Sequence, residues 1–167
     1  MSGFGGYLFR EMFFLGRCAV DRDEKIIETV SLFPRLNRLL VELLSGMDDD
    51  DWRAKTQFPN WTVKDIAAHL LDTSIRRLSG ERDSYRSAEN PDIRSWRDLI
   101  DYITHLADRW ALAFTNVSPA ILVEMIEKYQ DELSAYLSAL DPWGTAQFSV
   151  AWAGEAQSYN WFDIARE

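Results

Sequence analysis

The chain has 167 residues, which is enough for one domain with a full hydrophobic core. Hydrophobic residues make up 47% of it and aromatic residues 13%, a composition that argues against an intrinsically disordered chain. The formal net charge is −9, from 27 acidic and 18 basic residues, and an acidic surface that repels phosphates argues against nucleic-acid binding.

Residues 1–22 are expected to form a loosely ordered extension before a helical domain at residues 23–167. They include Cys18, the one cysteine of the chain, so neither an intramolecular disulfide nor a cysteine-based zinc site is available. The sequence contains no run of about 18 uncharged apolar residues, so no membrane-spanning segment is expected. Together these features favour a cytoplasmic protein.

The first helix is predicted at residues 23–45, with Gly46 as its C-cap residue. Pro34 lies within this range and removes one backbone hydrogen bond, so it predicts either a kink or the true beginning of the helix. The apolar residues recur at helical spacing and form one broad face: Ile26, Val30, Phe33, Leu36, Leu40 and Leu44, with Ile27, Leu39, Val41 and Leu43 beside them.

Residues 47–59 are predicted to connect the first two helices, and they include four consecutive acids, Asp48–Asp51. A cation site is one interpretation of such a run. Because consecutive side chains point in different directions and cannot converge on one ion, a solvated turn with helix-capping acids is favoured. Trp52 is expected to close one end of a helical bundle.

A second helix is predicted from Thr62 to about Ser79, with Gly80 ending it. Thr62 and Asp65 have the spacing of a capping box, in which each side chain accepts a hydrogen bond from the backbone N–H of the other residue. An apolar stripe follows at helical spacing: Val63, Ile66, Ala67, Leu70, Leu71, Ser74, Ile75 and Leu78.

His69 lies on the other side of this helix, in a column with Asp65, Asp72, Thr73 and Arg76. From the spacing alone, a solvated surface histidine is the favoured interpretation. The alternative is a metal ligand that faces a second groove at one end of a bundle.

A polar loop at residues 81–91 leads to a third helix that begins near Arg94 or Ser95. His105 lies on the outer face of this helix, where a solvated histidine is favoured over a functional one. Ser118 and Pro119 mark the start of a fourth helix that is predicted to end at about residue 140.

Residues 141–144 form a turn signal, and residues 148–152 alternate between apolar and polar side chains, which predicts an extended crossover laid on the helices. Asn160 and Asp163 then have the spacing of an N-cap and its capping-box acid at the start of a last helix. Because a helix of two turns is marginal on its own, we expect the sequence to be a fragment that stops early in this helix.

The loop residue Trp52 and the pattern Pro-x-Trp-Thr-Val-x-Asp-x-x-x-His-Leu at Pro59–Leu70 resemble the DinB/YfiT-like metalloenzyme superfamily. Within it, the chain looks like the bacterial maleylpyruvate isomerase N-terminal domain group, whose best-known members use mycothiol. The resemblance covers about residues 24–167. It implies an all-α, four-helix bundle with a divalent metal, zinc or nickel, near one end.

The resemblance also implies that His69 is the metal ligand contributed by the second helix. The other ligands of the family come from its last long helix, commonly as a Glu-x-x-x-His or His-x-x-x-His pair. Such a pair puts both side chains on one helix face. No such pair occurs in the 167 residues, so we expect this chain to bind metal weakly and to be inactive by itself.

Other residues near the expected site have two interpretations. Trp61, Trp143 and Trp152 are expected to pack at the end of the bundle, with a substrate wall as the alternative. Glu155 could supply a nearby acid, but a solvated loop carboxylate is favoured.

Two functions remain open. The resemblance implies the metal-binding domain of a thiol-dependent isomerase or transferase, with a small-molecule thiol and its substrate as partners. Asp65 or Asp72 would then hold the second ring nitrogen of His69. The alternative is a non-catalytic helical domain that binds a protein partner or a small molecule in an apolar groove. Neither function involves nucleic acid or a membrane, and both are compatible with a homodimer.

Overall fold

The structure is a computed structural model that describes residues 25–58, 60–86, 92–147 and 158–166. Its elements are η1 (Val30–Leu32), α2 (Phe33–Ser45), α3 (Asp49–Arg53), α4 (Val63–Arg77), η2 (Leu78–Arg82), α5 (Trp96–Ala113), α6 (Pro119–Ser138) and α7 (Asn160–Arg166). The described residues contain no strand, so the predicted all-α class is confirmed. None of the described helices is both long and apolar enough to cross a membrane.

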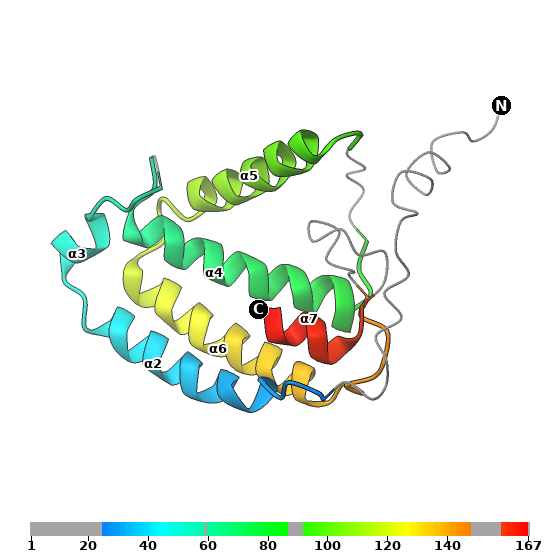
Figure 1. The fold of residues 1–167 in the computed structure, drawn as a ribbon. Coiled ribbons are helices and arrows are strands. Elements are labelled where there is room, and N and C mark those ends of the chain that lie inside the picture. Colours follow the sequence, from blue (N-terminus) through cyan, green and yellow to red (C-terminus); the bar gives the residue numbers. More distant parts are fainter. Residues whose placement is uncertain (1–24, 59, 87–91, 148–157, 167) are drawn as a thin grey trace.

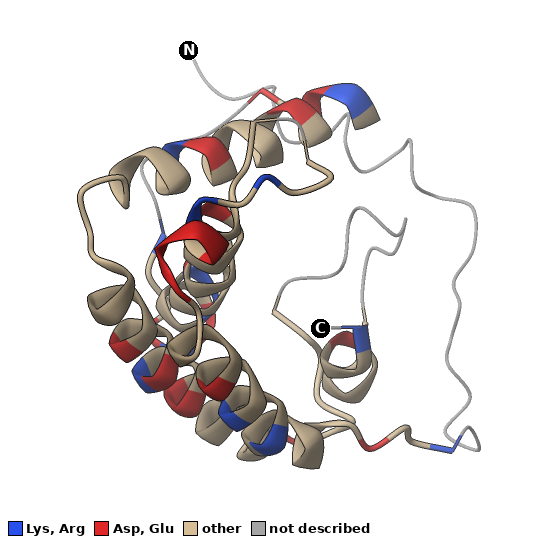
Figure 2. Ribbon diagram, turned by 90° about the vertical axis from the view of Figure 1, so that its left-hand side faces the viewer, with Lys and Arg blue, Asp and Glu red and all other residues tan. Residues whose placement is uncertain are grey.

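Helices α5, α4, α6 and α2 lie side by side in that order and form a curved layer (Figures 1 and 2). Helix α4 has α5 on one flank and α6 on the other, whereas α2 lies at an edge and packs against α6. Helix α7 lies against the concave face of the layer and runs in the opposite direction to α4 (Figure 1). This arrangement makes α4 the central helix of the structure.

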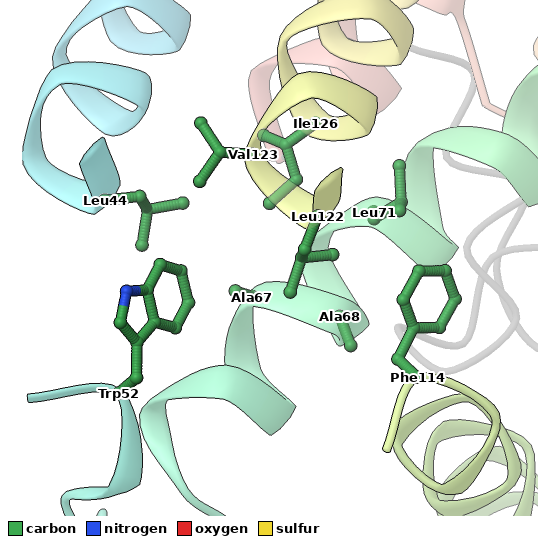
Figure 3. Close-up of a cluster of buried hydrophobic side chains, with 9 residues drawn as sticks. All are labelled: Leu44, Trp52, Ala67, Ala68, Leu71, Phe114, Leu122, Val123 and Ile126. Carbon is green, nitrogen blue, oxygen red and sulfur yellow. The ribbon is translucent and has the colours of Figure 1, made fainter. Parts of the chain in front are cut away.

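The main hydrophobic core lies between α2, α3, α4 and α6, at the end of the layer near α3 (Figure 3). Trp52 is buried there, as expected for a residue that closes the end of a bundle. The two alanines Ala67 and Ala68 let α6 approach α4 closely, because they present little more than a methyl group each. The buried residues of this cluster are Leu44, Trp52, Ala67, Ala68, Leu71, Phe114, Leu122, Val123 and Ile126.

The first helix begins at Phe33 and not at residue 23, so its predicted start is wrong; residues 25–29 are not helical. Pro34 lies in the first turn of this helix. Backbone N–H groups of a first turn have no acceptor within the helix, so a proline there, which lacks an N–H, breaks no helical hydrogen bond. Of the two roles predicted for Pro34, the beginning of the helix is therefore the one observed. The buried face is also narrower than predicted, because Leu36 and Leu39 are exposed at the edge of the layer.

The acidic run Asp48–Asp51 begins a helix, and two of its members, Asp48 and Asp51, cap it, as favoured from the sequence. Asp48 Oδ1 accepts hydrogen bonds from the backbone N–H groups of Asp50 and Asp51, both at 2.9 Å. Asp51 Oδ2 accepts one from the Asp48 N–H at 3.2 Å. The helix that they begin is α3, which adds one short helix to the connection predicted for residues 47–59.

The predicted capping box at the start of α4 is confirmed. The backbone N–H and the hydroxyl of Thr62 donate to Asp65 Oδ2 at 2.8 and 2.7 Å, and the Asp65 N–H donates to Thr62 Oγ1 at 3.3 Å. Two backbone donors that a free helix end would leave unpaired are thus satisfied.

Replacing Thr62 by alanine removes one of these acceptors, and we expect a loss of about 1 kcal/mol in the free energy of unfolding. Urea unfolding followed by circular dichroism measures the loss. Thr115→Ala is the control, because Thr115 is exposed just after α5. Equal stability of the two variants would show that the cap contributes nothing.

Gly80 was predicted to end the second helix, and this prediction is wrong. The chain continues beyond α4 as the π-helical turn η2, in which Gly80 and Glu81 are buried. Arg77 Nε lies 3.1 Å from Glu81 Oε1, and only 9% of the Arg77 and 5% of the Glu81 side chain is exposed. Glu81 therefore has a buried partner, Arg77, one turn earlier, and this ion pair favours a helical backbone past Gly80.

Helices α5 and α6 begin where the sequence predicts. Ser95 Oγ accepts a hydrogen bond from the Asp98 N–H at 3.1 Å, and Ser118 Oγ accepts one from the Ile121 N–H at 3.3 Å. His105 of α5 is exposed, in agreement with the solvated position favoured for it.

Helix α7 begins at Asn160, whose side-chain amide donates to the Asp141 carbonyl at 2.8 Å. A Cβ atom at Gly144 would lie 2.8 Å from that amide nitrogen, so a larger residue there would displace the Asn160 side chain from this hydrogen bond. Asp163, which the sequence suggested as a capping-box acid, forms an ion pair with Arg77 of α4. The crossover predicted at residues 148–152 lies outside the described residues.

Candidate metal centre

Because α4 lies between α5 and α6, more of its surface is buried than its single apolar stripe predicts. Asp72 was placed with His69 on the solvated side, but Asp72 is 0% exposed and His69 is half-buried. The prediction of one solvated column is therefore wrong. The physical reason is that α5 and α6 cover both flanks of α4, so a single apolar stripe does not delimit its buried surface.

His69 packs against the indole ring of Trp61, with the two ring centroids 5.4 Å apart. Trp61 is itself held in place, because its Nε1 donates a hydrogen bond to Asp108 Oδ1 of α5 at 2.9 Å. Trp61 is therefore a packing residue at the start of α4, and one side of the His69 ring lies against it. His69 Nδ1 is buried and has no hydrogen-bond partner within the described part of the chain.

Burial lowers the pKa of His69 below its usual 6.5, and the nearby Asp72 carboxylate opposes this effect only in part. The imidazole is therefore neutral at pH 7. A neutral imidazole keeps a lone pair on one ring nitrogen, which is the form that binds a metal ion.

Asp72 is a buried carboxylate with one close cationic partner. Its Oδ2 lies 2.6 Å from Arg76 Nη2, one turn further along α4. Its Oδ1 is buried and has no hydrogen-bond partner among the described residues. Burial raises the pKa of Asp72, and the Arg76 guanidinium counteracts this rise. The sequence spacing placed Asp72 and Arg76 beside His69. The burial of Asp72 could not be predicted in this way, because it depends on the neighbouring helices.

The remaining candidate residues do not join this site. His105 is exposed on α5, and Asp65 is used in the cap of α4. Trp143 packs edge-on against Tyr159 and Trp161, with ring centroids 5.3 and 6.2 Å away, as expected for a packing residue. Trp152 and Glu155 lie outside the described residues.

Two groups of α4 therefore lie close together at this position. His69 offers a neutral nitrogen, and the nearby Asp72 carboxylate is paired with the Arg76 guanidinium. No group of three or more His, Cys, Asp or Glu side chains lies close enough to hold an ion, as far as the described ranges extend. These residues fit one end of a metal site but not a complete set of ligands.

Comparison with known families gives a match. The sequence model of the mycothiol maleylpyruvate isomerase N-terminal domain matches residues 33–161, from the first residue of α2 into the first turn of α7. The matched range is more than half of the chain and contains the Thr62–Asp65 cap and His69. Searches among curated proteins and among solved structures return no significant match.

Proposed function

Because the chain belongs to the family of mycothiol maleylpyruvate isomerase N-terminal domains, we propose that it is the metal-binding domain of a thiol-dependent isomerase or transferase. The observation that supports this proposal most directly is the state of His69. Its ring is neutral and half-buried, it is packed against Trp61, and its Nδ1 has no partner among the described residues.

His69 would bind a zinc or nickel ion through one ring nitrogen. Asp72 lies nearby, and Arg76 pairs its carboxylate. Trp61 lies against one side of the imidazole, and its indole is anchored to Asp108. A complete site needs about two further protein ligands, which the described residues do not supply.

When bound in such a site, a divalent metal would lower the pKa of a thiol or a water molecule and would polarise a carbonyl group. The residues of this chain have a supporting role in that chemistry. His69 would act as a neutral ligand, Trp61 would cover one side of its ring, and Asp72 would balance the charge of Arg76. A small-molecule thiol and its substrate are the partners that this function requires.

The proposal is tested by adding nickel to the protein and recording the ring-proton resonances of its two histidines by NMR. Because His69 has a neutral ring and a carboxylate nearby, we expect its signals to broaden at lower nickel concentration than those of His105. Zinc should compete and restore the His69 signals. In calorimetry, His69→Ala should weaken nickel binding by at least about tenfold.

His105→Ala is the matched control, since this residue is an exposed histidine on a neighbouring helix. It should leave nickel binding unchanged. If the signals of both histidines broaden in parallel, or if His69→Ala binds nickel as the unaltered protein does, His69 is not a ligand and the proposed function loses its support.

A further inference from the structure

Four leucines of η1 and α2 form an exposed apolar stripe, although leucines of a small helical domain are usually buried. Their exposed fractions are 50% for Leu32, 57% for Leu36, 51% for Leu39 and 59% for Leu43. The spacings of four, three and four residues place all of them on one side of the helix. We refer to Leu32, Leu36, Leu39 and Leu43 as the leucine stripe.

The leucine stripe has no partner among the described residues because α2 is an edge helix (Figures 1 and 2). The packed side of α2 meets α6, and its most buried residues are Asn37 and Leu44, which are 6% and 5% exposed. Asn37 and Leu44 are seven residues apart, so they mark one face of the helix, and the stripe lies on another face.

Two opposite charges border the leucine stripe on one side. Arg35 and Glu42 are also seven residues apart, and each immediately precedes a leucine of the stripe. Both are exposed, and neither forms an ion pair with another residue of the described ranges. In the notation of coiled coils they occupy g positions, and the leucines occupy a and d.

These positions select one way of pairing. When two copies of α2 pack antiparallel about a two-fold axis, Leu36 meets the partner's Leu39, and Leu32 meets the partner's Leu43. The g positions then face each other, so Arg35 lies opposite the partner's Glu42. The two-fold axis repeats this pair, and every charge at the border meets an opposite charge.

Parallel pairing gives no such match. In a parallel pair, g positions face e positions, and Arg35 would lie against the partner's Leu40. We therefore propose that two copies of this chain associate through their leucine stripes, with α2 packed antiparallel to α2 of the other copy. This interface is separate from the metal centre of α4 and does not depend on the proposed function.

The size of the stripe sets the expected strength of this association. A standard stable interface buries about 800 Å² on each partner. Four leucines and their borders on one short helix offer less than this area. We therefore expect a reversible dimer with a dissociation constant in about the micromolar range.

The first experiment is sedimentation velocity over a range of protein concentrations. The unaltered protein should shift from monomer to dimer as its concentration rises. The variants Arg35→Glu and Glu42→Arg each place like charges opposite one another twice in the dimer, and each should weaken the association by about tenfold or more. Both positions are exposed, so the fold should not change, and circular dichroism checks this.

Mixing the two single variants gives the sharpest test. In a mixed dimer, the acid of one variant faces the arginine of the other at both borders, so an equimolar mixture should associate as tightly as the unaltered protein. The double variant Arg35→Glu/Glu42→Arg should also recover. If the mixture stays as monomeric as its components, the antiparallel arrangement is wrong.

A change within the leucine stripe tests the apolar contact directly. Leu39→Asp should abolish the dimer, whereas Leu112→Asp, at a position 75% exposed on α5, should leave it intact. An unaltered protein that remains monomeric well above micromolar concentrations would overturn the proposal. So would equal effects of the two aspartate variants.

Discussion

Replacement of Arg77 by alanine is expected to lower the free energy of unfolding by about 3–5 kcal/mol. Arg77 lies between two buried carboxylates. Its Nε is 3.1 Å from Glu81 Oε1, and its Nη2 forms an ion pair with Asp163 of α7. The side chains of Glu81 and Asp163 are only 5% and 10% exposed. Without the guanidinium, two negative charges remain buried with their main cationic partner gone.

The second effect of Arg77→Ala is local. The ion pair with Asp163 ties α7 to α4, so its loss should loosen α7 before the rest of the layer unfolds. Hydrogen exchange should show faster exchange in α7 than in α6. The free energy of unfolding follows from urea titration monitored by circular dichroism.

The matched control is Arg53→Ala. Arg53 also pairs with an acid one turn away, Asp49 Oδ2 at 3.2 Å, but the two side chains are 73% and 81% exposed. An exposed pair of this kind contributes about 0–1 kcal/mol. If both variants lose the same small amount, burial of the Arg77 pair has no energetic consequence, and the account of α7 docking given above is wrong.

Replacement of Leu122 by alanine is expected to cost about 4 kcal/mol, near the upper end of the range for such changes. Leu122 is 0% exposed on α6, and its neighbours in the core include Ala67 and Ala68 of α4 (Figure 3). These alanines are too small to move into the space that a missing isobutyl group leaves. The cavity should therefore stay open and add its full penalty to the lost burial.

Two further variants separate cavity formation from other causes. Ile121→Ala alters the next residue, which is 51% exposed, and should change stability by no more than about 0.5 kcal/mol. Leu122→Met keeps most of the volume and should cost less than about 1.5 kcal/mol. Urea titration measures all three. A large loss for Leu122→Met would contradict the cavity explanation, because little volume is removed.

The features predicted correctly from the sequence are those that depend on residues within one helical turn. The Thr62–Asp65 capping box and the serine caps at Ser95 and Ser118 need only a side-chain oxygen near the first unpaired backbone N–H groups. The same local chemistry made the all-α class and the starts of α4, α5 and α6 predictable. The family resemblance, which the match over residues 33–161 confirms, likewise rested on a pattern of short-range spacing.

Three of the wrong predictions, those on Gly80, on Asp72 and on the buried face of α2, share a different cause. The helical turn beyond Gly80 exists because Glu81 has a buried partner that is itself bound to α7, far along the chain. Asp72 is buried because α4 has neighbours on both flanks. Leu36 and Leu39 are exposed because α2 has a neighbour on one side. Each outcome depends on where a helix lies in the layer, which its own sequence does not encode.

The amino-acid sequence by itself therefore determined the helical class of this protein and most helix starts, and it pointed to the family. Only the tertiary structure decided which flank of each helix is covered, and with it the environment of His69 and the exposure of the leucine stripe. The physical reason is that capping is a contact between near neighbours in the chain. Burial depends on which helices, distant in sequence, pack on either side.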